Sequence, residues 1–330
     1  MPKILIIGGS GVISQHSLAA LLRAGGEVAV ARRGAVAHAG YAAFVANRHD
    51  PAALHHALYA FQPEVVIDFA CFTRADAQGL VAALPPAVRQ VVFVSTVDVY
   101  GVPLPQVPMP EDGPWSPPGG TYASEKRLTE TALTGWLDAR GIALTFVRPT
   151  CSIGQRFMIS LFDRSARNLV SRLRQGLPIP VPAPGPANTA QGKIHPSDAA
   201  DTGRMIARVA GATRAMGQQY TVGSPGTAMT HLAYIGLIAQ AMGVQAQPAL
   251  IPRDFLDSDP SVPPDSLYHE LTRWDLGYSL GKFGADFSDF TPTTDLVGCI
   301  QSYVAALDPT AQIGGANQED HIIRAWGQGR

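Results

Sequence analysis

The sequence predicts an α/β fold built on a doubly wound parallel sheet, and three observations lead to this prediction. Apolar runs alternate with helical patterns through the first half of the chain. The runs 65–67 and 91–94 are continuously rich in Val, Ile and Phe, as expected of strands that are buried on both faces. The run 3–7 ends in glycines, and a helical pattern begins directly after them.

This alternation assigns the elements in order. We expect strands at residues 3–7, 27–31, 43–46, 64–70, 90–95 and 143–148, and helices at 11–24, 51–61, 74–84 and 122–140. Helical connections of this length imply right-handed crossovers that cover both faces of the sheet. Beyond residue 150 the pattern weakens, with helices expected at 158–175, 197–210, 230–242 and 294–306 and strands at 219–222 and 247–251.

The length of the chain predicts a second, smaller unit. With 330 residues it exceeds the size at which one hydrophobic core usually stops growing, about 250 to 300 residues. We expect a first domain of residues 1–150, to which 195–225 returns, and a smaller C-terminal lobe of 151–194 and 226–330. The tail 313–330, which is rich in glycine and polar residues, is expected to be loosely held.

Two proline-rich stretches interrupt the pattern. Residues 103–118 hold seven prolines, and 178–186 alternates proline with apolar and small residues. Proline lacks an N–H and fixes φ, so neither stretch is a central strand or a helix interior. The first stretch falls at the carboxyl edge of the expected sheet, where it either covers a ligand or forms an ordinary surface loop.

Composition and charge exclude several classes of partner. Lys and Arg total 25 against 26 for Asp and Glu, so no excess charge recruits nucleic acid or an anionic membrane surface. No stretch approaches the roughly 20 apolar residues of a membrane span, and the first three residues lead at once into a strand, which predicts a cytoplasmic protein with small-molecule partners. The three cysteines are widely spaced and the nine histidines lack ligand spacing, so we expect no disulfide framework and no metal.

The most informative motif is the glycine turn after the first strand, Gly8-Gly9-Ser10-Gly11. The backbone N–H groups of such a turn and the positive end of the following helix dipole attract phosphate. Glycine also lets a ligand approach without a Cβ in its way. The turn therefore predicts a Rossmann-type site for a dinucleotide pyrophosphate, although Ser14 stands where the fingerprint has its third glycine.

The residues that follow the second strand predict which dinucleotide binds. Arg32 and Arg33 stand roughly 20 residues after the turn, where NAD-binding proteins place an acid for the ribose hydroxyl. Two guanidinium groups would instead hold the 2′-phosphate of NADP with charge-assisted hydrogen bonds. We therefore expect NADP(H) rather than NAD; the alternative is a pair of solvated arginines at a strand end.

A tyrosine and a lysine four residues apart predict acid–base chemistry. Tyr122 and Lys126 share one face of the expected helix. A phenol with its usual pKa of about 10 is a poor catalyst at neutral pH, and a nearby ammonium stabilises the phenolate. Thr96, at the end of the buried strand 90–95, places a hydroxyl where it can hydrogen-bond a substrate oxygen.

Several ordered motifs together resemble the extended short-chain dehydrogenase/reductase family, which includes NAD-dependent epimerases and dehydratases. They are the glycine turn, Asp68-Phe69-Ala70-Cys71, Ser95-Thr96-x-x-Val99-Tyr100-Gly101, Tyr122-x-x-x-Lys126, Val147-Arg148-Pro149 and Lys193-Ile194-His195-Pro196-Ser197-Asp198. The resemblance covers nearly the whole chain. It implies a Rossmann-type nucleotide domain, a smaller C-terminal substrate-binding lobe and a homodimer paired through two long helices.

The resemblance also assigns roles to residues. Tyr122 would donate or accept the proton, Lys126 would lower the pKa of Tyr122 and bind the nicotinamide ribose, and Thr96 would hold the reacting oxygen. The remaining expected cofactor contacts are Gly8, Ser10, Gly11, Val12 and Ile13 at the pyrophosphate, Arg32 and Arg33 at the 2′-phosphate, Asn47 at the adenine, Ala70 and Cys71 beneath the cofactor, and Pro149 and Thr150 beside the nicotinamide.

Departures from the family pattern leave the substrate open. The dehydratases follow the catalytic threonine with two acids, whereas this chain has Val97 and Asp98, of which Asp98 is either an acid–base group or a turn carboxylate. Cys151 stands where epimerases often have a substrate-contacting asparagine. The arginine that commonly binds the nucleotide diphosphate is absent from 191–193, and the candidates to compensate are Lys193, Arg156, Arg164 and Arg167. The substrate therefore need not be a nucleotide sugar.

Three functions fit these residues. The first is an NADP(H)-dependent oxidoreductase that transfers hydride to or from a carbonyl or carbinol carbon of a sugar-like or other polar metabolite, with Tyr122 as acid or base. The second is a nucleotide-sugar epimerase or dehydratase that recycles its cofactor within one cycle. The third is a non-catalytic nucleotide-sensing or RNA-associated relative, which the retained catalytic residues and the near-neutral charge argue against.

Overall fold

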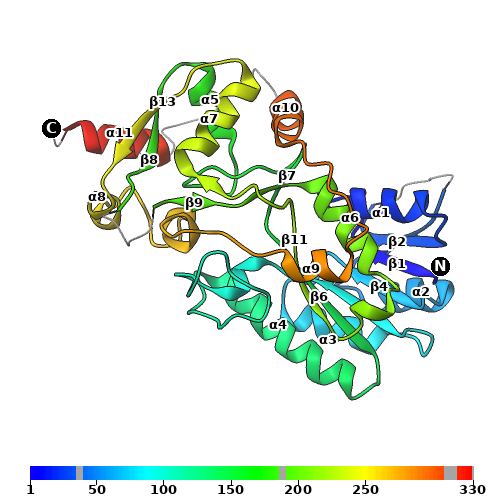
Figure 1. Cartoon of the computed structure of the whole chain (residues 1–330). Helices are drawn as coiled ribbons and strands as arrows, with labels where there is room; N and C mark the ends of the chain where they lie inside the picture. The colour runs from blue at the N-terminus through cyan, green and yellow to red at the C-terminus, as the bar shows by residue number, and fades with distance from the viewer. Residues whose placement is uncertain (35–39, 186–190, 308–317, 329–330) are drawn as a thin grey trace.

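A seven-stranded parallel sheet forms the centre of the protein (Figure 1). The computed structural model describes residues 1–34, 40–185, 191–307 and 318–328. The strands are β1 (Ile4–Ile7), β2 (Val28–Arg32), β3 (Ala42–Val45), β4 (Val65–Asp68), β5 (Gln90–Val94), β6 (Ala143–Pro149) and β11 (Gln219–Val222). Their order across the sheet is β11-β6-β5-β4-β1-β2-β3. The predicted doubly wound α/β fold is confirmed.

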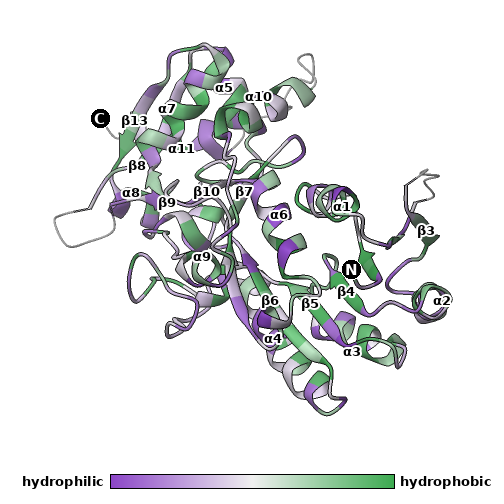
Figure 2. Cartoon of the chain, turned by 45° about the vertical axis from the view of Figure 1, so that its right-hand side comes forward, coloured by the Kyte–Doolittle hydropathy of each residue, from purple (hydrophilic) through white to green (hydrophobic). Residues whose placement is uncertain are grey.

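Helices cover both faces of this sheet, because alternate side chains of each strand point to opposite sides. One face carries α1 (Ser14–Arg23) and α6 (Ala199–Val209), and the other carries α2 (Pro51–Phe61), α3 (Arg74–Ala83) and α4 (Thr121–Asp138). In β1, Ile4 and Ile6 pack toward the first pair of helices, while Leu5 and Ile7 pack toward the other three. The central strands are accordingly green in Figure 2.

The strand order determines where a ligand site forms. It reverses between β1 and β4, the two strands that lie side by side although two others separate them in the sequence. Open α/β sheets bind their ligands beyond the carboxyl ends of the strands at such a point. The glycine turn after β1 and the residues that follow β4 and β5 all lie at this edge.

The smaller C-terminal lobe is built around a two-stranded parallel sheet. Its strands and main helices are β8 (Pro178–Pro182), β13 (Gln247–Ile251), α5 (Arg167–Arg174), α7 (His231–Met242), α8 (Arg253–Ser258), α10 (Leu296–Ala306) and α11 (Gln318–Gln328). The prolines of β8 are tolerated because both strands of a two-stranded sheet are edge strands. The helix expected over 158–175 begins only at Arg167. None of the described helices is long and apolar enough to cross a membrane.

The expectation of a loosely held tail is wrong for residues 318–328. They form α11, in which Ile322 is fully buried. This helix contacts β8, and its Asp320 forms an ion pair with Arg172 of α5. The glycine and polar content of the tail therefore did not indicate the helix, which has one apolar face. Residues 313–317 and 329–330 lie outside the described part of the chain.

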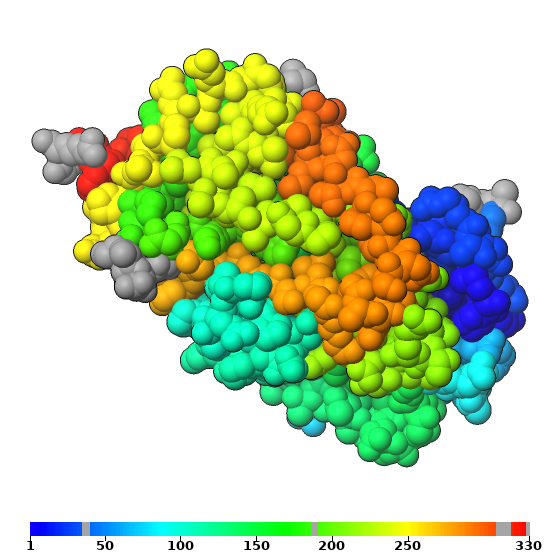
Figure 3. All heavy atoms as spheres, viewed as in Figure 1, coloured from blue at the N-terminus to red at the C-terminus, as the bar shows by residue number. Residues whose placement is uncertain are grey.

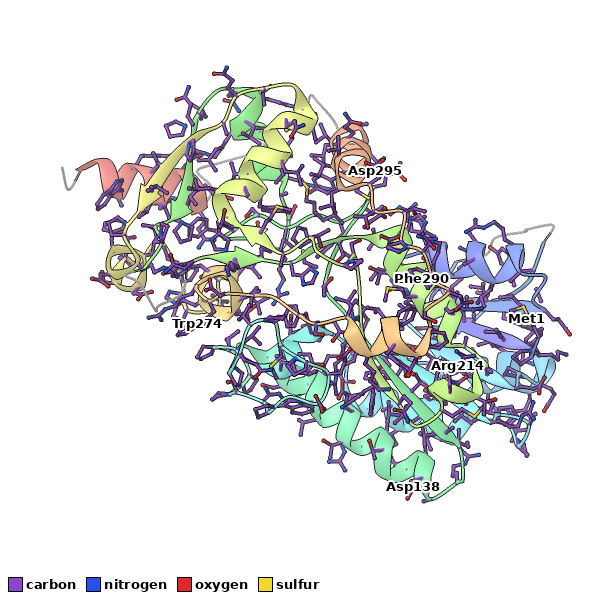
Figure 4. All side chains as sticks on the ribbon, viewed as in Figure 1. Met1, Asp138, Arg214, Trp274, Phe290 and Asp295 are labelled. Carbon is purple, nitrogen blue, oxygen red and sulfur yellow. The ribbon has the colours of Figure 1, made fainter. Side chains whose placement is uncertain are left out.

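Several segments join the lobe to the sheet. Three of them carry short strands: β7 (Cys151–Ile153), β9 (Lys193–Ile194) with β10 (Pro196–Asp198), and β12 (Met229–Thr230). A further segment runs from Trp274 through α9 (Gly281–Asp286) past Phe290 to Asp295, three positions labelled in Figure 4. Helix α9 comes from a part of the chain expected in the lobe, yet Phe283 packs edge-on against Tyr220 of β11.

The first proline-rich stretch lies at this junction. It follows a short helical turn, η1 (Val97–Tyr100), and leads into α4. Met109 accepts a backbone hydrogen bond from Ser279 and donates one to Gly277, both at 2.8 Å. In Figure 3 the stretch appears in teal against the orange segment that contains these two residues.

A buried ion pair ties β6 to α4. Arg148, which is 2% exposed, donates from Nε and Nη2 to the carboxylate of Glu130 at 3.1 and 2.7 Å. Its Nη1 donates to the Tyr100 hydroxyl at 3.1 Å and to the backbone oxygen of Glu111 at 3.2 Å. A buried pair adds little net stability, but removing one partner leaves an uncompensated charge in the interior.

We predict that Glu130→Ala lowers the free energy of unfolding by about 3–5 kcal/mol, because it leaves the Arg148 guanidinium buried without its counter-ion. Urea denaturation followed by circular dichroism measures the change. The control is Glu27→Ala, which removes the exposed pair with Lys3 and should cost at most about 1 kcal/mol. If the two variants lose similar amounts, the buried pair does not have this role.

Candidate active site

The glycine turn after β1 has the geometry of an anion cradle. Gly8 and Gly9 have φ values of 111° and 85°, which side chains other than glycine rarely adopt. A Cβ at Gly9 would also lie 2.6 Å from Cγ1 of Val30. The Gly11 N–H donates to the Ser14 hydroxyl at 2.9 Å, so the serine in place of the third glycine holds the turn. Together with the start of α1, the turn fits a pyrophosphate group.

The end of β2 carries the two arginines expected at the 2′-phosphate. Arg33 is exposed, whereas Arg32 is half-buried. Its Nε and Nη2 are buried and have no hydrogen-bond partner among the described residues. Asn47, expected at the adenine, is exposed, and its side-chain oxygen accepts from the His49 N–H at 3.2 Å. The Asn47 side-chain oxygen therefore already accepts a hydrogen bond within its own turn, although it was expected to accept one from the adenine.

Arg48, which the sequence analysis missed, organises the carboxyl edge of the sheet. Its Nη1 lies 2.9 Å from both carboxylate oxygens of Asp68 at the end of β4, and its Nη2 donates to the Asp76 carbonyl at 2.8 Å. Asp68 also accepts from the Ala70 N–H at 2.8 Å. The pair thus fixes the backbone at Ala70 and Cys71, where the cofactor is expected to pass.

Thr96, Tyr122 and Lys126 come together between the end of β5 and the start of α4. The Lys126 ammonium is buried and donates to the carbonyl oxygens of Cys71 and Val94 at 2.8 and 2.9 Å. It lies 5.9 Å from the centre of the Tyr122 ring. Thr96 accepts from a backbone N–H at 3.2 Å and lies within reach of the Tyr122 hydroxyl. The structure therefore assembles the three side chains that the sequence grouped.

The electrostatics of this cluster favour the neutral phenol. Burial, and after it the Asp98 carboxylate, raise the pKa of Tyr122, while Arg164 and the Thr96 hydroxyl act in the opposite direction. Burial lowers the pKa of Lys126 to about 8. Both shifts favour the uncharged forms of the two side chains.

The tentative substrate residues divide into two groups. Asp98 lies near both Cys151 and Tyr122. Burial raises the pKa of the Asp98 carboxyl and raises the pKa of Cys151 to about 12. Lys193 lies in β9, where its backbone N–H donates to Asp275 at 3.0 Å.

Pro149, at the end of β6, and Thr150, which follows it, lie at the edge of the sheet next to the end of β5. Both are buried, and the Thr150 hydroxyl lies 2.5 Å from that of Ser197. The Thr150 N–H donates to the Val222 carbonyl at 3.0 Å. These contacts direct the threonine hydroxyl toward β10, so this position is held rigidly.

Arg164, which the sequence offered only as a candidate for the substrate diphosphate, lies over Tyr122, and it pairs with Glu270, which the sequence did not indicate. The Arg164 guanidinium is 5.6 Å from the centre of the Tyr122 ring, and its Nη2 is 2.5 Å from a carboxylate oxygen of Glu270. Glu270 belongs to the π-helical turn η3 (Tyr268–Thr272) of the lobe. A Cβ at Gly120 would lie 2.2 Å from its Oε1, so the glycines before Tyr122 make room for Glu270. The two adjacent glycines are a sequence signal for close packing at this position, but they do not indicate that Glu270 is the residue that packs there.

A hollow of about 650 Å³ extends from Arg164 along the loop between β7 and α5 to α10. Arg156 also lines it and donates from Nη1 to the Ser10 carbonyl of the glycine turn at 3.2 Å. The hollow therefore lies between the expected pyrophosphate position and the side chains over Tyr122.

Comparisons with known proteins place this site in context. A 2′-dehydrokanamycin reductase from Streptomyces kanamyceticus is 34% identical over 146 residues, which are 43% of this chain and 41% of that reductase, so the match spans less than half of the relative. UDP-glucose 4-epimerase from Thermus thermophilus, in complex with NAD, has a TM-score of 0.68 at 21% identity and covers 92% of this chain and 98% of its own. The dTDP-glucose 4,6-dehydratase from Bacillus anthracis, also in complex with NAD, has a TM-score of 0.69 at 15% identity. That match covers 93% of this chain and 96% of the dehydratase.

The two solved structures show that the fold is shared along nearly the whole chain. The NAD dependent epimerase/dehydratase model matches residues 4–223, a span that contains the glycine turn, Tyr122 and Lys126. On this match, the chain belongs to the NAD dependent epimerase/dehydratase family and is a nicotinamide-dinucleotide enzyme of the extended short-chain dehydrogenase/reductase type.

Proposed function

We propose that this protein is an NADP(H)-dependent reductase that acts on a carbonyl group of a sugar-like or other polar metabolite. The observation that carries the proposal is the assembly of Thr96, Tyr122 and Lys126 at the sheet edge that also holds the glycine turn. The phenol there is protonated at neutral pH, which is the form that reduction of a carbonyl requires.

The side chains divide the chemistry between them. When bound, the nicotinamide supplies the hydride. Tyr122 donates its hydroxyl proton to the carbonyl oxygen of the substrate, and Thr96 hydrogen-bonds the same oxygen. The Lys126 ammonium, held by two backbone carbonyls beside the ring, stabilises the phenolate that the transfer leaves behind.

The preference for NADP(H) rests on the arginines after β2. The solved relatives carry NAD, so the fold by itself does not favour the phosphorylated cofactor. Arg32, however, has two buried guanidinium nitrogens without a partner among the described residues. Unpaired buried donors are costly, and a 2′-phosphate would satisfy them with charge-assisted hydrogen bonds. No acid that would accept from a ribose hydroxyl occupies 32–34.

Two observations favour a reductase over an epimerase or dehydratase that recycles its cofactor. Val97 replaces one of the two acids that dehydratases place after the threonine. The matched relative from Streptomyces kanamyceticus is named as a reductase, although the match spans 41% of it. Steady loss of NADPH absorbance distinguishes a reductase from an epimerase or dehydratase, in which the cofactor shows no net change.

We predict that the protein binds NADP⁺ at least about tenfold more tightly than NAD⁺, and that Arg32→Asp reverses this order because a carboxylate repels the 2′-phosphate. Isothermal titration measures both affinities. Arg89→Asp is the matched control, since Arg89 is exposed and precedes β5 at the opposite edge of the sheet. A wild-type preference for NAD⁺ would contradict the cofactor assignment.

We predict that Tyr122→Phe slows carbonyl reduction about 10²- to 10⁴-fold, because it removes the proton donor, while NADPH binding is retained. The assay follows NADPH consumption with a panel of oxo-sugars that includes 2′-dehydrokanamycin. Tyr59→Phe, on the exposed surface of α2, is the control and should leave the rate unchanged. Full activity of Tyr122→Phe would exclude this tyrosine as the acid.

The raised pKa of Tyr122 also predicts a difference between the two directions of the reaction. Below this pKa the phenol stays protonated, so the rate of reduction should be flat across the neutral range. Oxidation of the corresponding alcohol needs the phenolate, whose fraction grows about tenfold per pH unit below the pKa, so its rate should rise with pH. Initial rates in both directions, with the best substrate of the panel, check this. Oxidation that does not change with pH would contradict it.

A further inference from the structure

We propose that Glu270 and Asp98 bind an ammonium group of the substrate close to the reacting carbon, in the space that the Arg164 guanidinium fills in this structure. The inference rests on the proposed reductase function and adds a substrate class: an oxo compound that carries a protonated amine, such as an amino sugar. Three observations lead to it: Arg164 is exposed and replaceable, Glu270 is held in place, and the two side chains carry opposite charges.

The group that covers Tyr122 is itself a cation. The Arg164 guanidinium lies 5.6 Å from the centre of the Tyr122 ring and pairs with Glu270 at 2.5 Å. The Arg164 side chain is 46% exposed and comes from the loop between β7 and α5, so solvent is open to it. A substrate whose carbonyl oxygen reaches the Tyr122 hydroxyl has to share or take this space.

Glu270, by contrast, is held in place. Its backbone N–H donates to Ser266 at 3.0 Å, and two residues later the Thr272 hydroxyl donates to the Leu161 carbonyl at 2.5 Å. Its backbone oxygen and its carboxylate lie where Cβ atoms at Gly119 and Gly120 would be, at 2.1 and 2.2 Å. π-Helical turns of this kind occur frequently at functional sites. The backbone that carries the carboxylate therefore stays beside Gly119 and Gly120, just before Tyr122, when the arginine moves.

The charge balance selects the incoming group. When Arg164 turns toward solvent, the Glu270 carboxylate loses its partner and Asp98 loses the cation that most favours its charged form, which leaves Lys126 as the cation that still does so. Acidic groups left in a largely buried site without their nearest cation are costly. An ammonium restores the balance and offers three donors to them. An anionic group would instead add a third negative charge.

A role of Arg164 as a receptor for an anionic substrate leads to the opposite expectation. In that case Arg164 would have to give up Glu270 and remain over Tyr122, and its removal would weaken binding. If an ammonium replaces it, removal of the guanidinium eliminates a competitor, and binding becomes tighter. The sign of the effect of Arg164→Gln therefore separates the two roles.

The test measures binding to the NADP⁺ complex of the full chain by isothermal titration, with kanamycin and its fully N-acetylated form as probes. We expect kanamycin to bind about tenfold or more tightly than the acetylated compound, as one charge-assisted hydrogen bond implies. Glu270→Gln should remove this difference, and Arg164→Gln should strengthen kanamycin binding. Asp112→Asn, an exposed acid of the proline-rich loop, is the control and should change neither.

Three results would overturn the inference: no saturable binding of kanamycin, equal binding of the two probes, or weaker binding to Arg164→Gln. Each is distinct from failure of the proposed function. Failure of NADP⁺ to bind contradicts the reductase proposal itself. Binding of NADP⁺ without discrimination between the probes contradicts only the assignment of an amine-bearing substrate.

Discussion

The two hydrogen bonds of the Lys126 ammonium are the interaction on which the site depends. They join helix α4 to the carbonyl oxygens of Cys71 and Val94, which lie at the ends of neighbouring strands. Tyr122 lies one turn earlier on the same helix, so these bonds set the position of the phenol above the sheet edge. A buried ammonium needs such partners, because burial without them favours loss of its proton. The same atoms thus hold the catalytic helix and the backbone beneath the expected cofactor.

The sequence predicted the sheet and the helices that cover it because their signals are local. Strands buried on both faces leave continuous apolar runs, and the glycine turn marks where the first one ends. The helix 51–61 and the strand 219–222 were predicted with the bounds that the structure shows. The meeting of Thr96 with Tyr122 and Lys126 follows from the same information, since a helix that follows a parallel strand begins at the edge of the sheet where that strand ends.

The sequence could not predict the contacts made between distant elements. Arg48 follows β3, and its partner Asp68 ends β4; two strands, β2 and β1, lie between them in the sheet. No spacing rule connects them, and the family pattern drew attention to Asn47 instead. Glu270 is connected to Tyr122 through Arg164, which it pairs with and which lies over the Tyr122 ring. In α11 the apolar face is short and glycine-rich sequence precedes it, so its helix forms through packing on β8 rather than through a strong local pattern.

The two glycines before Tyr122 have a mechanical consequence. Main-chain atoms of the lobe press directly on main-chain atoms at Gly119, without an intervening side chain. A contact of this kind has no rotamer through which it can relax, so it acts as a fulcrum. Rotation of the lobe about this contact would change the spacing next to Tyr122 less than the spacing at more distant points. A ligand could then be admitted between the lobe and the sheet without a change in the position of the phenol.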